Sequence, residues 1–143
     1  MSIPKVVIDT SVMVSVAFAK EGLARALRDM IADDAFTVVT SREIMTEVYR
    51  VLHYPRILRD FAPSEEDISE FIGMIVEHAE FTEGLYRLDK IEADPTDDMF
   101  LACALEAKAD YILSRDPHLR NLKQFHGVKI IDVKGFIEKV RKG

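Results

Sequence analysis

The sequence of 143 residues predicts an α/β fold with three layers, in which helices flank a central, mostly parallel sheet of four to five strands. Short runs of β-branched residues alternate with longer segments whose apolar residues recur at helical spacing. That alternation is typical of a parallel sheet covered on both faces. A chain of this length can bury a substantial core without cross-links, so we expect one domain over residues 1–143.

Strands are predicted where short apolar runs are rich in β-branched residues. The four clearest runs are Lys5–Ile8, Phe36–Val39, Tyr111–Leu113 and Val128–Ile131. A weaker candidate, Glu80-Phe81-Thr82, would add a fifth strand to the sheet.

Helices are predicted in the segments between these strands. In Leu23–Ala32, apolar residues stand at positions 23, 26, 27, 30 and 31, which is the spacing of one buried face. The segment Thr40-Ser41-Arg42-Glu43 has the pattern of a capping box and begins a helix that runs to about Leu52. Further helices are predicted from Ser64 to about Ala79, from Asp94-Pro95 onward, and over Val133–Lys142.

The composition is that of an ordinary globular protein with an acidic balance. The net charge is −6 and the pI is near 5.2, which disfavours a simple nucleic-acid-binding protein. A metal-dependent nuclease stays compatible with this charge, because bound cations offset clustered acids. The single cysteine, Cys103, excludes a disulfide framework and a thiolate zinc site, and we interpret it as a small buried hydrophobic residue. No segment predicts a signal peptide or a membrane span, so we expect a reducing cytoplasm as the location.

Four acidic residues stand at the ends or first turns of separate predicted elements: Asp9, Glu47, Asp98 and Asp116. If the strands that precede Asp9 and Asp116 are parallel neighbours, both acids lie at the carboxyl edge of the sheet, where open α/β sheets bind ligands. Two carboxylates about 5 Å apart repel by roughly 3 kcal/mol at an effective dielectric near 20. A divalent cation would offset this repulsion, and oxygen ligands suit Mg²⁺ or Mn²⁺.

Each acid also has a simpler interpretation. Asp9 precedes Thr10-Ser11 and is suited to cap the following helix. Glu47 lies at the rim of an apolar helical stripe, where it either faces the site or pairs with a nearby arginine on the surface. Asp98 stands in a first helical turn, as does Asp97, and sequence spacing separates the two only weakly. Asp116 precedes proline, and taken by itself the Asp-Pro pair favours a turn.

Other charged and polar residues give weaker signals. The four histidines lack metal-ligand spacing, which disfavours zinc, and only His118 is close to the predicted acids. Basic residues gather in three groups, which are either solvated surface or, for the two internal groups, phosphate contacts. The groups are Arg50, Arg56 and Arg59; then Arg115, Arg120 and Lys123; then Lys134, Lys139, Arg141 and Lys142. No P-loop, Gly-x-Gly-x-x-Gly or Gly-x-Ser-x-Gly motif is present, so nucleotide-binding and serine-hydrolase classes lack support.

The ordered set of motifs resembles the PIN-domain nucleases, in particular the toxin components of type II toxin–antitoxin pairs (VapC-like). The resemblance covers roughly residues 6 to 138 and depends on the order of the segments rather than on any one of them. The segments are Val7-Ile8-Asp9-Thr10-Ser11, Glu43-Ile44-Met45-Thr46-Glu47, Tyr54-Pro55-Arg56, Asp94-Pro95-Thr96-Asp97-Asp98-Met99-Phe100-Leu101-Ala102 and Ala109-Asp110-Tyr111-Ile112-Leu113-Ser114-Arg115-Asp116.

This resemblance implies roles for particular residues. It implies that Asp9, Glu47, Asp98 and Asp116 are the catalytic, metal-binding acids, and it selects Asp98 over Asp97. Supporting hydroxyls would come from their sequence neighbours. The supporting hydroxyls are Thr10, Ser11 and Ser114. Apart from the resemblance, Arg115 and His118 are candidate phosphate contacts, and an exposed loop histidine is the simpler interpretation of His118.

The sequence departs from the family pattern at two places. Ser11 stands where many members have asparagine, which keeps a polar group there. Many members have a further acid where this chain has Pro117-His118-Leu119. The lack of this acid weakens the expectation of a second metal ion and leaves the expectation of the first unchanged.

The function implied by the resemblance is hydrolysis of RNA phosphodiester bonds with Mg²⁺ or Mn²⁺. It also implies a small antitoxin protein as partner and a homodimer. Two alternatives stay open: a non-catalytic PIN-like module that binds RNA or protein, and a receiver-like phosphoacceptor domain. Thr10-Ser11 disfavours the receiver, which has adjacent acids after the first strand, and Ser11 disfavours a haloacid-dehalogenase-type phosphatase, which has aspartate there.

Overall fold

The computed structural model describes residues 3–85 and 98–142. Within these residues, six strands form one sheet in the spatial order β3-β2-β1-β4-β6-β5. The strands are β1 (Lys5–Ile8), β2 (Thr37–Thr40), β3 (Ala79–Phe81), β4 (Tyr111–Leu113), β5 (Gln124–Phe125) and β6 (Val128–Ile131). All pairings are parallel except that of β5 with β6, so the predicted α/β class with a mostly parallel sheet is confirmed.

Strand β1 lies between β2 and β4, which places a topological switch point beside it. The chain first builds one half of the sheet through β2 and β3, and then crosses to the other side of β1 through β4 and β6. The connection after β1 leads to β2 on one side, and the connection after β4 leads to β5 and β6 on the other. Both connections start at the same edge of the sheet. Ligands of open α/β sheets bind in the crevice that such a reversal leaves.

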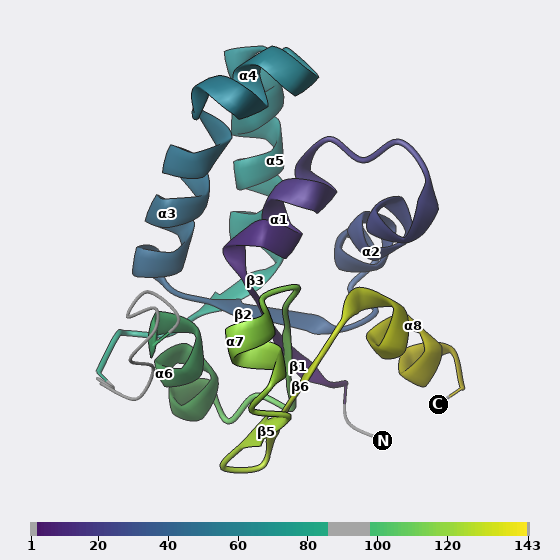
Figure 1. Cartoon of the computed structure of the whole chain (residues 1–143), viewed down its shortest axis with the longest axis vertical. Coiled ribbons are helices and arrows are strands. Elements are labelled where there is room, and N and C mark those ends of the chain that lie inside the picture. Colours follow the sequence, from purple (N-terminus) through teal and green to yellow (C-terminus); the bar gives the residue numbers. More distant parts are fainter. Residues whose placement is uncertain (1–2, 86–97, 143) are drawn as a thin grey trace.

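Eight helices surround the sheet in the described part of the chain (Figure 1). They are α1 (Thr10–Ala17), α2 (Gly22–Ala32), α3 (Arg42–Leu52), α4 (Pro55–Phe61), α5 (Glu65–His78), α6 (Asp98–Ala107), α7 (Pro117–Arg120) and α8 (Val133–Lys142). Helices α3, α4 and α5 gather at one end of the molecule, at the top of the view, and α6 lies at the lower left. Helix α6 packs on β1, β2 and β4, whereas α1 packs between α2 and α3.

The core forms because the central strands are apolar on both faces. Val6, Val7 and Ile8 of β1 are all buried, as expected for a parallel strand with helices on each side. Helix α6 is buried through most of its length, which agrees with its nearly continuous apolar sequence. Helix α3 instead buries one face, with Ile44 and Val48 inside and Glu47 at the rim.

All four clear strand predictions are confirmed to within one residue, and the weak candidate near residue 80 is β3. The sixth strand, β5, was not predicted because two residues show no alternation. His126 and Gly127 join it to β6 with φ of 49° and 87°, as a tight two-residue hairpin turn requires. Helices α4 and α7 were not predicted, and α1 was expected only as the helix that follows Asp9, without bounds. The start of the helix expected at Asp94-Pro95 lies outside the described residues.

The predicted cap of α3 is shifted by one residue. Ser41, not Thr40, is the N-cap, and its Oγ accepts a hydrogen bond from the Ile44 backbone N–H at 3.1 Å. Thr40 ends β2, and its buried hydroxyl has no hydrogen-bond partner among the residues that the structure describes. The cap at Ser64 agrees with the prediction and is completed by Asp67 in a capping box.

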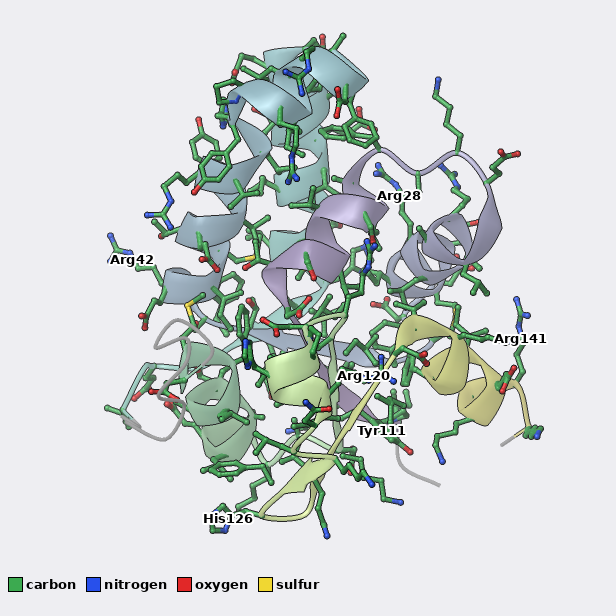
Figure 2. The ribbon with its side chains drawn as sticks, viewed as in Figure 1. Arg28, Arg42, Tyr111, Arg120, His126 and Arg141 are labelled. Carbon is green, nitrogen blue, oxygen red and sulfur yellow. The ribbon has the colours of Figure 1, made fainter. Side chains whose placement is uncertain are left out.

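Basic side chains lie on several faces rather than on one. Arg42 and Arg141 project outward on opposite sides of the molecule (Figure 2). Arg28 turns inward instead, where its guanidinium donates hydrogen bonds to the Val16 and Ala17 carbonyls at the end of α1 and lies 5.5 Å from the centre of the Phe71 ring. No helix in the described ranges is long and apolar enough to cross a membrane.

Candidate active site

Asp9 stands where β1 ends and α1 begins, beside β4. Its backbone N–H donates to the Leu113 carbonyl at 3.0 Å, which continues the pairing of the two strands. Its Oδ1 accepts hydrogen bonds from the Val12 backbone N–H at 2.9 Å and from the Ser11 hydroxyl at 3.0 Å. The simpler interpretation of Asp9 as the cap of the following helix is therefore confirmed, but its second oxygen does not take part in that cap.

The second oxygen of Asp9 is bound to Ser114, from the other strand of the switch point. The Ser114 hydroxyl is fully buried and donates to Asp9 Oδ2 at 2.5 Å. The same hydroxyl accepts a hydrogen bond from the Asp116 backbone N–H at 2.9 Å. Ser114 thus connects the two acids that follow β1 and β4, although their sequence positions are more than a hundred residues apart.

The Asp9 carboxyl lies in an environment that disfavours its charged form. Only 4% of the residue is exposed, and this burial raises the pKa of its carboxyl above the ordinary value. Hydrogen bonds from Ser114, Val12 and Ser11 lower that pKa, and the nearby negative charge of Asp116 raises it further. A proton or a bound cation would relieve the cost of this buried charge.

Glu47 reaches the same region from α3. Its Oε2 accepts a hydrogen bond from the Thr10 hydroxyl at 2.5 Å, and its Oε1 lies 3.8 Å from an Arg50 guanidinium nitrogen. The interpretation of Glu47 as a partner of a nearby arginine is thus partly confirmed, but the contact with Thr10 is much shorter. This contact joins α3 to Thr10, which is the first residue of α1 and follows Asp9 in the chain.

Asp98 is placed differently from the other three acids. It begins α6 and is buried, yet it is not among the residues that line the pocket described below. Asp97, the alternative that the sequence left open, lies outside the described residues. Within the described ranges, no three histidine, cysteine or acidic side chains are grouped closely enough to hold a metal ion. Binding of one ion by all four acids therefore stays a prediction.

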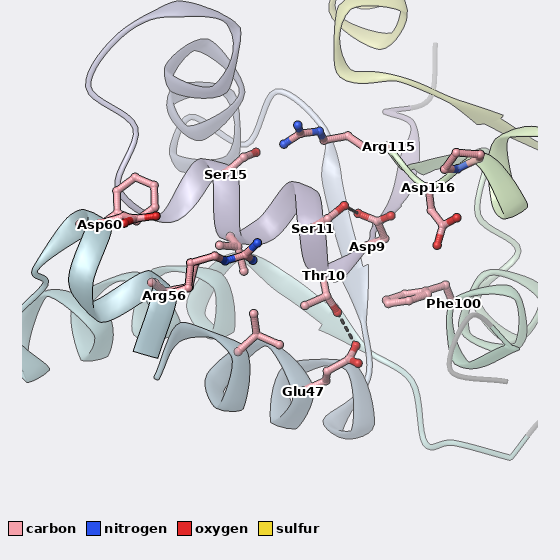
Figure 3. A pocket seen from close by; sticks show the side chains of 15 residues that line it. Asp9, Thr10, Ser11, Ser15, Glu47, Arg56, Asp60, Phe100, Arg115 and Asp116 are labelled. Carbon is pink, nitrogen blue, oxygen red and sulfur yellow. Dashed lines mark hydrogen bonds between the residues drawn. The ribbon is translucent and has the colours of Figure 1, made fainter. Parts of the chain in front are cut away.

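An open pocket of about 820 Å³ lies at this edge of the sheet (Figure 3). At one end it is lined by Asp9, Glu47 and Asp116, which we call the acidic end. At the other end it is lined by residues of α4, and Figure 3 shows Asp60 and Arg56 there, away from Asp9 and Asp116. The supporting hydroxyls Thr10 and Ser11 line the pocket between them, and Phe100 of α6 contributes an apolar wall.

Two arginines enter this pocket from different elements. Arg56 comes from α4 and Arg115 from the loop after β4, and neither forms an ion pair with a residue that the structure describes. Both guanidinium groups are therefore available to form an ion pair with an anion in the pocket. His118 is exposed and does not line the pocket, although its backbone N–H donates to Asp116 at 2.8 Å.

The donors at the acidic end are carboxylate and hydroxyl oxygens, which suit a hard cation such as Mg²⁺ or Mn²⁺. The sequence did not single out Asp60, Phe61 or Phe100 as pocket residues. For the first two the signal was available, because Pro55 follows an extended Tyr54 and is suited to the first position of a helix. Recognition of α4 would have placed Asp60 one turn from Arg56.

Comparisons with known proteins agree with this architecture. A family profile described as PIN domain matches residues 5–118, which is most of the chain. The structure of Mycobacterium tuberculosis VapC20, described as a toxin that cleaves the sarcin–ricin loop, superposes with a TM-score of 0.56 at 15% identity over 87% of this chain and 98% of that chain. The T. brucei RRP44 PIN domain gives a TM-score of 0.51 at 13% identity over 99% of this chain and 83% of that chain. A comparison with curated proteins finds no match. The profile match, which runs from β1 into α7, shows that the chain belongs to the PIN-domain family.

Proposed function

We propose that this protein is a metal-dependent endoribonuclease that hydrolyses RNA phosphodiester bonds. The observation that carries the proposal is the buried Asp9 carboxylate, which shares Ser114 with Asp116 at the switch point of the sheet. A buried carboxyl whose pKa is raised by desolvation is typical of a functional site rather than of a helix cap alone. The family match supports nuclease chemistry, and the solved relatives include a toxin that cleaves RNA.

The acids at the acidic end would hold Mg²⁺ or Mn²⁺, with Asp98 approaching from the start of α6. When bound, such an ion lowers the pKa of a coordinated water and neutralises charge that develops on phosphate oxygens. Asp116 or Asp98 would orient the attacking water. Asp116 is the N-cap of α7 after β4, and Asp98 begins α6, which packs on β1 and β4. Ser114 and Thr10 would fix the carboxylates, and Arg115 would contact the phosphate.

The biological role that fits best is that of a toxin in a type II toxin–antitoxin pair. The support is the fold shared with VapC20, together with the ordered motifs of the sequence. On this proposal residues 1–143 form one domain that acts in the cytoplasm as a homodimer and is inhibited by a small antitoxin protein.

A non-catalytic RNA- or protein-binding module is the second candidate. It is favoured by one observation, which is that Asp98 does not line the pocket with the other three acids. The two candidates differ in whether divalent ions bring about strand scission, so one assay separates them.

The experiment compares RNA cleavage by the full chain with Mn²⁺, with Mg²⁺ and with EDTA. We expect cleavage only with the ions, and products with 5′-phosphate ends. Asp9→Asn should reduce the rate on the order of 1,000-fold, since it removes a ligand charge at the centre of the site. Asp33→Asn, which neutralises an exposed acid at the end of α2, is the matched control and should cleave at the wild-type rate. Full activity of Asp9→Asn would refute the assignment.

A further inference from the structure

The pocket is larger than an ion and one phosphate group require, and its second end has a distinct chemistry. A volume of about 820 Å³ is in the range of pockets that hold whole small-molecule ligands. At the end away from Asp9, it is lined by Arg56, Asp60 and Phe61 of α4, which we call the α4 end. We propose that the α4 end binds a guanine base of the RNA substrate, stacked on Phe61 and read by Asp60. This inference rests on the proposed ribonuclease function and names the base that it would recognise.

Helix α4 presents these side chains from a fixed backbone. Pro55 begins the helix, and Ala62 ends it in a left-handed conformation with φ of 44° directly before Pro63. Ile57 is buried and anchors the helix to the rest of the protein. Residues 56, 57, 60 and 61 follow helical spacing and all line the pocket, so one face of α4 forms this wall.

Phe61 provides a surface for stacking. Its side chain lines the pocket, yet the residue is 52% exposed, which is unusual for a large aromatic residue. The Phe18 ring lies against it, with ring centres 5.5 Å apart at an interplanar angle of 36°. Phe18 thus supports one side of the ring. Bases of single-stranded RNA stack on aromatic rings that are held in this way.

Asp60 determines which base binds, through the hydrogen bonds that its carboxylate accepts. Its Oδ1 accepts a hydrogen bond from the Arg59 side chain at 3.2 Å, and its Oδ2 has no partner among the described residues. An ionised carboxylate only accepts hydrogen bonds. Of the four bases, only guanine presents two adjacent donors, N1–H and the 2-amino group, on its Watson–Crick edge. Adenine and cytosine place an acceptor nitrogen beside their amino group, and uracil places its one donor between two carbonyls, so each would repel one carboxylate oxygen.

The charges of the pocket agree with this assignment. The Asp60 carboxylate would repel a phosphate group. It would favour binding of a nucleotide only where it accepts hydrogen bonds from donors of the base. Arg56 stands one turn earlier on the same face of α4 without an ion pair to any described residue, and it can contact the phosphate of the bound nucleotide. The RNA would then extend from the α4 end, where a base is recognised, to the acidic end, where a phosphate is cleaved.

The first experiment measures binding without cleavage, with 5′-GMP, 5′-AMP, 5′-CMP and 5′-UMP titrated into the full chain by ligand-observed NMR in EDTA. We expect GMP to bind about tenfold more tightly than the others, the size of discrimination typical of one bidentate contact to a base. Asp60→Asn should lose this preference and favour AMP and CMP, because an amide can donate to adenine N1 or cytosine N3 and accept from the adjacent amino group. Glu70→Gln, an exposed neutralisation on α5, is the matched control and should behave as wild type.

The second experiment measures kcat/KM with Mn²⁺ on short single-stranded RNAs that differ at one base. We expect about tenfold faster cleavage beside guanosine than beside inosine, which lacks the 2-amino group. Phe61→Leu should lower kcat/KM for all bases by about tenfold without changing their order, because stacking does not depend on the hydrogen-bonding edge.

The outcomes separate this inference from the proposed function. If GMP binds preferentially and no RNA is cleaved, the guanine site stands and the nuclease proposal fails. If RNA is cleaved but all four nucleotides bind alike and Asp60→Asn changes nothing, Asp60 is only a surface partner of Arg59 and the guanine site is refuted. Circular dichroism of each variant verifies the fold.

Discussion

The acidic end and the α4 end of the pocket hold their carboxylates in opposite ways. Asp9 is 4% exposed and accepts hydrogen bonds from Val12, Ser11 and Ser114. Asp60 is exposed and accepts one hydrogen bond, from its neighbour Arg59. The first carboxylate is fixed before any ligand arrives, while the second keeps an oxygen available to a partner.

This difference corresponds to two kinds of task. Chemistry at a phosphate needs oxygens held within a fraction of an ångström, so a buried and fully bonded carboxylate is favoured despite the cost of its charge. Recognition of a base needs an acceptor that is free to exchange water for the ligand. Substitutions that remove a hydrogen bond to a carboxylate of the acidic end should therefore lower cleavage more than removal of a pocket hydroxyl that does not contact a carboxylate.

Removal of the Ser114 hydroxyl gives the largest expected effect of these changes. Ser114→Ala leaves Asp9 Oδ2 and the Asp116 backbone N–H without their shared partner. We expect kcat/KM for RNA to fall by about 10- to 100-fold and Mn²⁺ to bind more weakly, as is typical when a residue that orients a ligand is lost. Isothermal titration with Mn²⁺ and the cleavage assay measure the two effects.

Ser15→Ala is the matched control for this prediction. Ser15 also lines the pocket, but its hydroxyl donates to the Val12 carbonyl and not to a carboxylate. Equal losses in the two variants would mean that Ser114 acts only through general packing.

Thr10 tests the second connection of the acidic end, with a smaller expected effect. Thr10→Val keeps the shape of the side chain but removes the hydrogen bond to Glu47. We expect cleavage to fall by about tenfold, at the lower end of effects for such supporting contacts. Thr10→Ser retains the hydroxyl and should restore most of the rate. A loss of the same size in both variants would contradict a role for the hydroxyl and point to altered packing around position 10, because only Thr10→Ser lacks the methyl group.

The sequence predicted the sheet well because parallel strands buried on both faces are continuous apolar runs. Val6-Val7-Ile8 and Tyr111-Ile112-Leu113 could be recognised without knowledge of their neighbours. The pairing of these two strands was only a condition in the sequence analysis, and the structure confirms it. Given that pairing, the acids that follow the two strands lie at the same edge of the sheet. The least predictable strand was β5, whose only local signal is the His126-Gly127 turn.

The pocket was predicted at its acidic end and missed at its α4 end, for a physical reason. Asp9 and Asp116 follow strands, and sheet geometry relates strand ends over long sequence distances. Asp60 and Phe61 belong to a short helix that has only one buried residue, Ile57, so no apolar periodicity marks it. The position of α4 over the pocket depends on the packing of α3 and α5, which sequence spacing alone does not supply.

Asp9→Asn should stabilise the protein in the absence of metal. This is the smallest predicted effect, and it connects stability to function. Burial raises the pKa of Asp9 in the folded state, so the folded chain binds this proton more tightly than the unfolded chain does. The contribution of Asp9 to the stability of the wild type therefore falls as pH rises from about 4, the ordinary value, through the raised pKa. Asparagine has no charge to desolvate. Its Oδ1 can still accept the hydrogen bond from the Val12 N–H, and its Nδ2 can donate to the Ser114 hydroxyl oxygen. Thermal unfolding in EDTA at pH 7 should show a gain of about 1 kcal/mol, in the range of single stabilising substitutions.

The same substitution should reverse its effect when divalent ions are added. Mn²⁺ should raise the melting temperature of the wild type, because an ion that binds only the folded state stabilises it, and should leave Asp9→Asn nearly unchanged. At about pH 4 in EDTA the advantage of the variant should shrink, since the raised pKa means that the wild-type carboxyl is more protonated in the folded state there than at pH 7. A variant that is less stable than wild type at both pH values would mean that Asp9 serves the fold as a helix cap, and that its burial is not the mark of a metal-binding carboxylate.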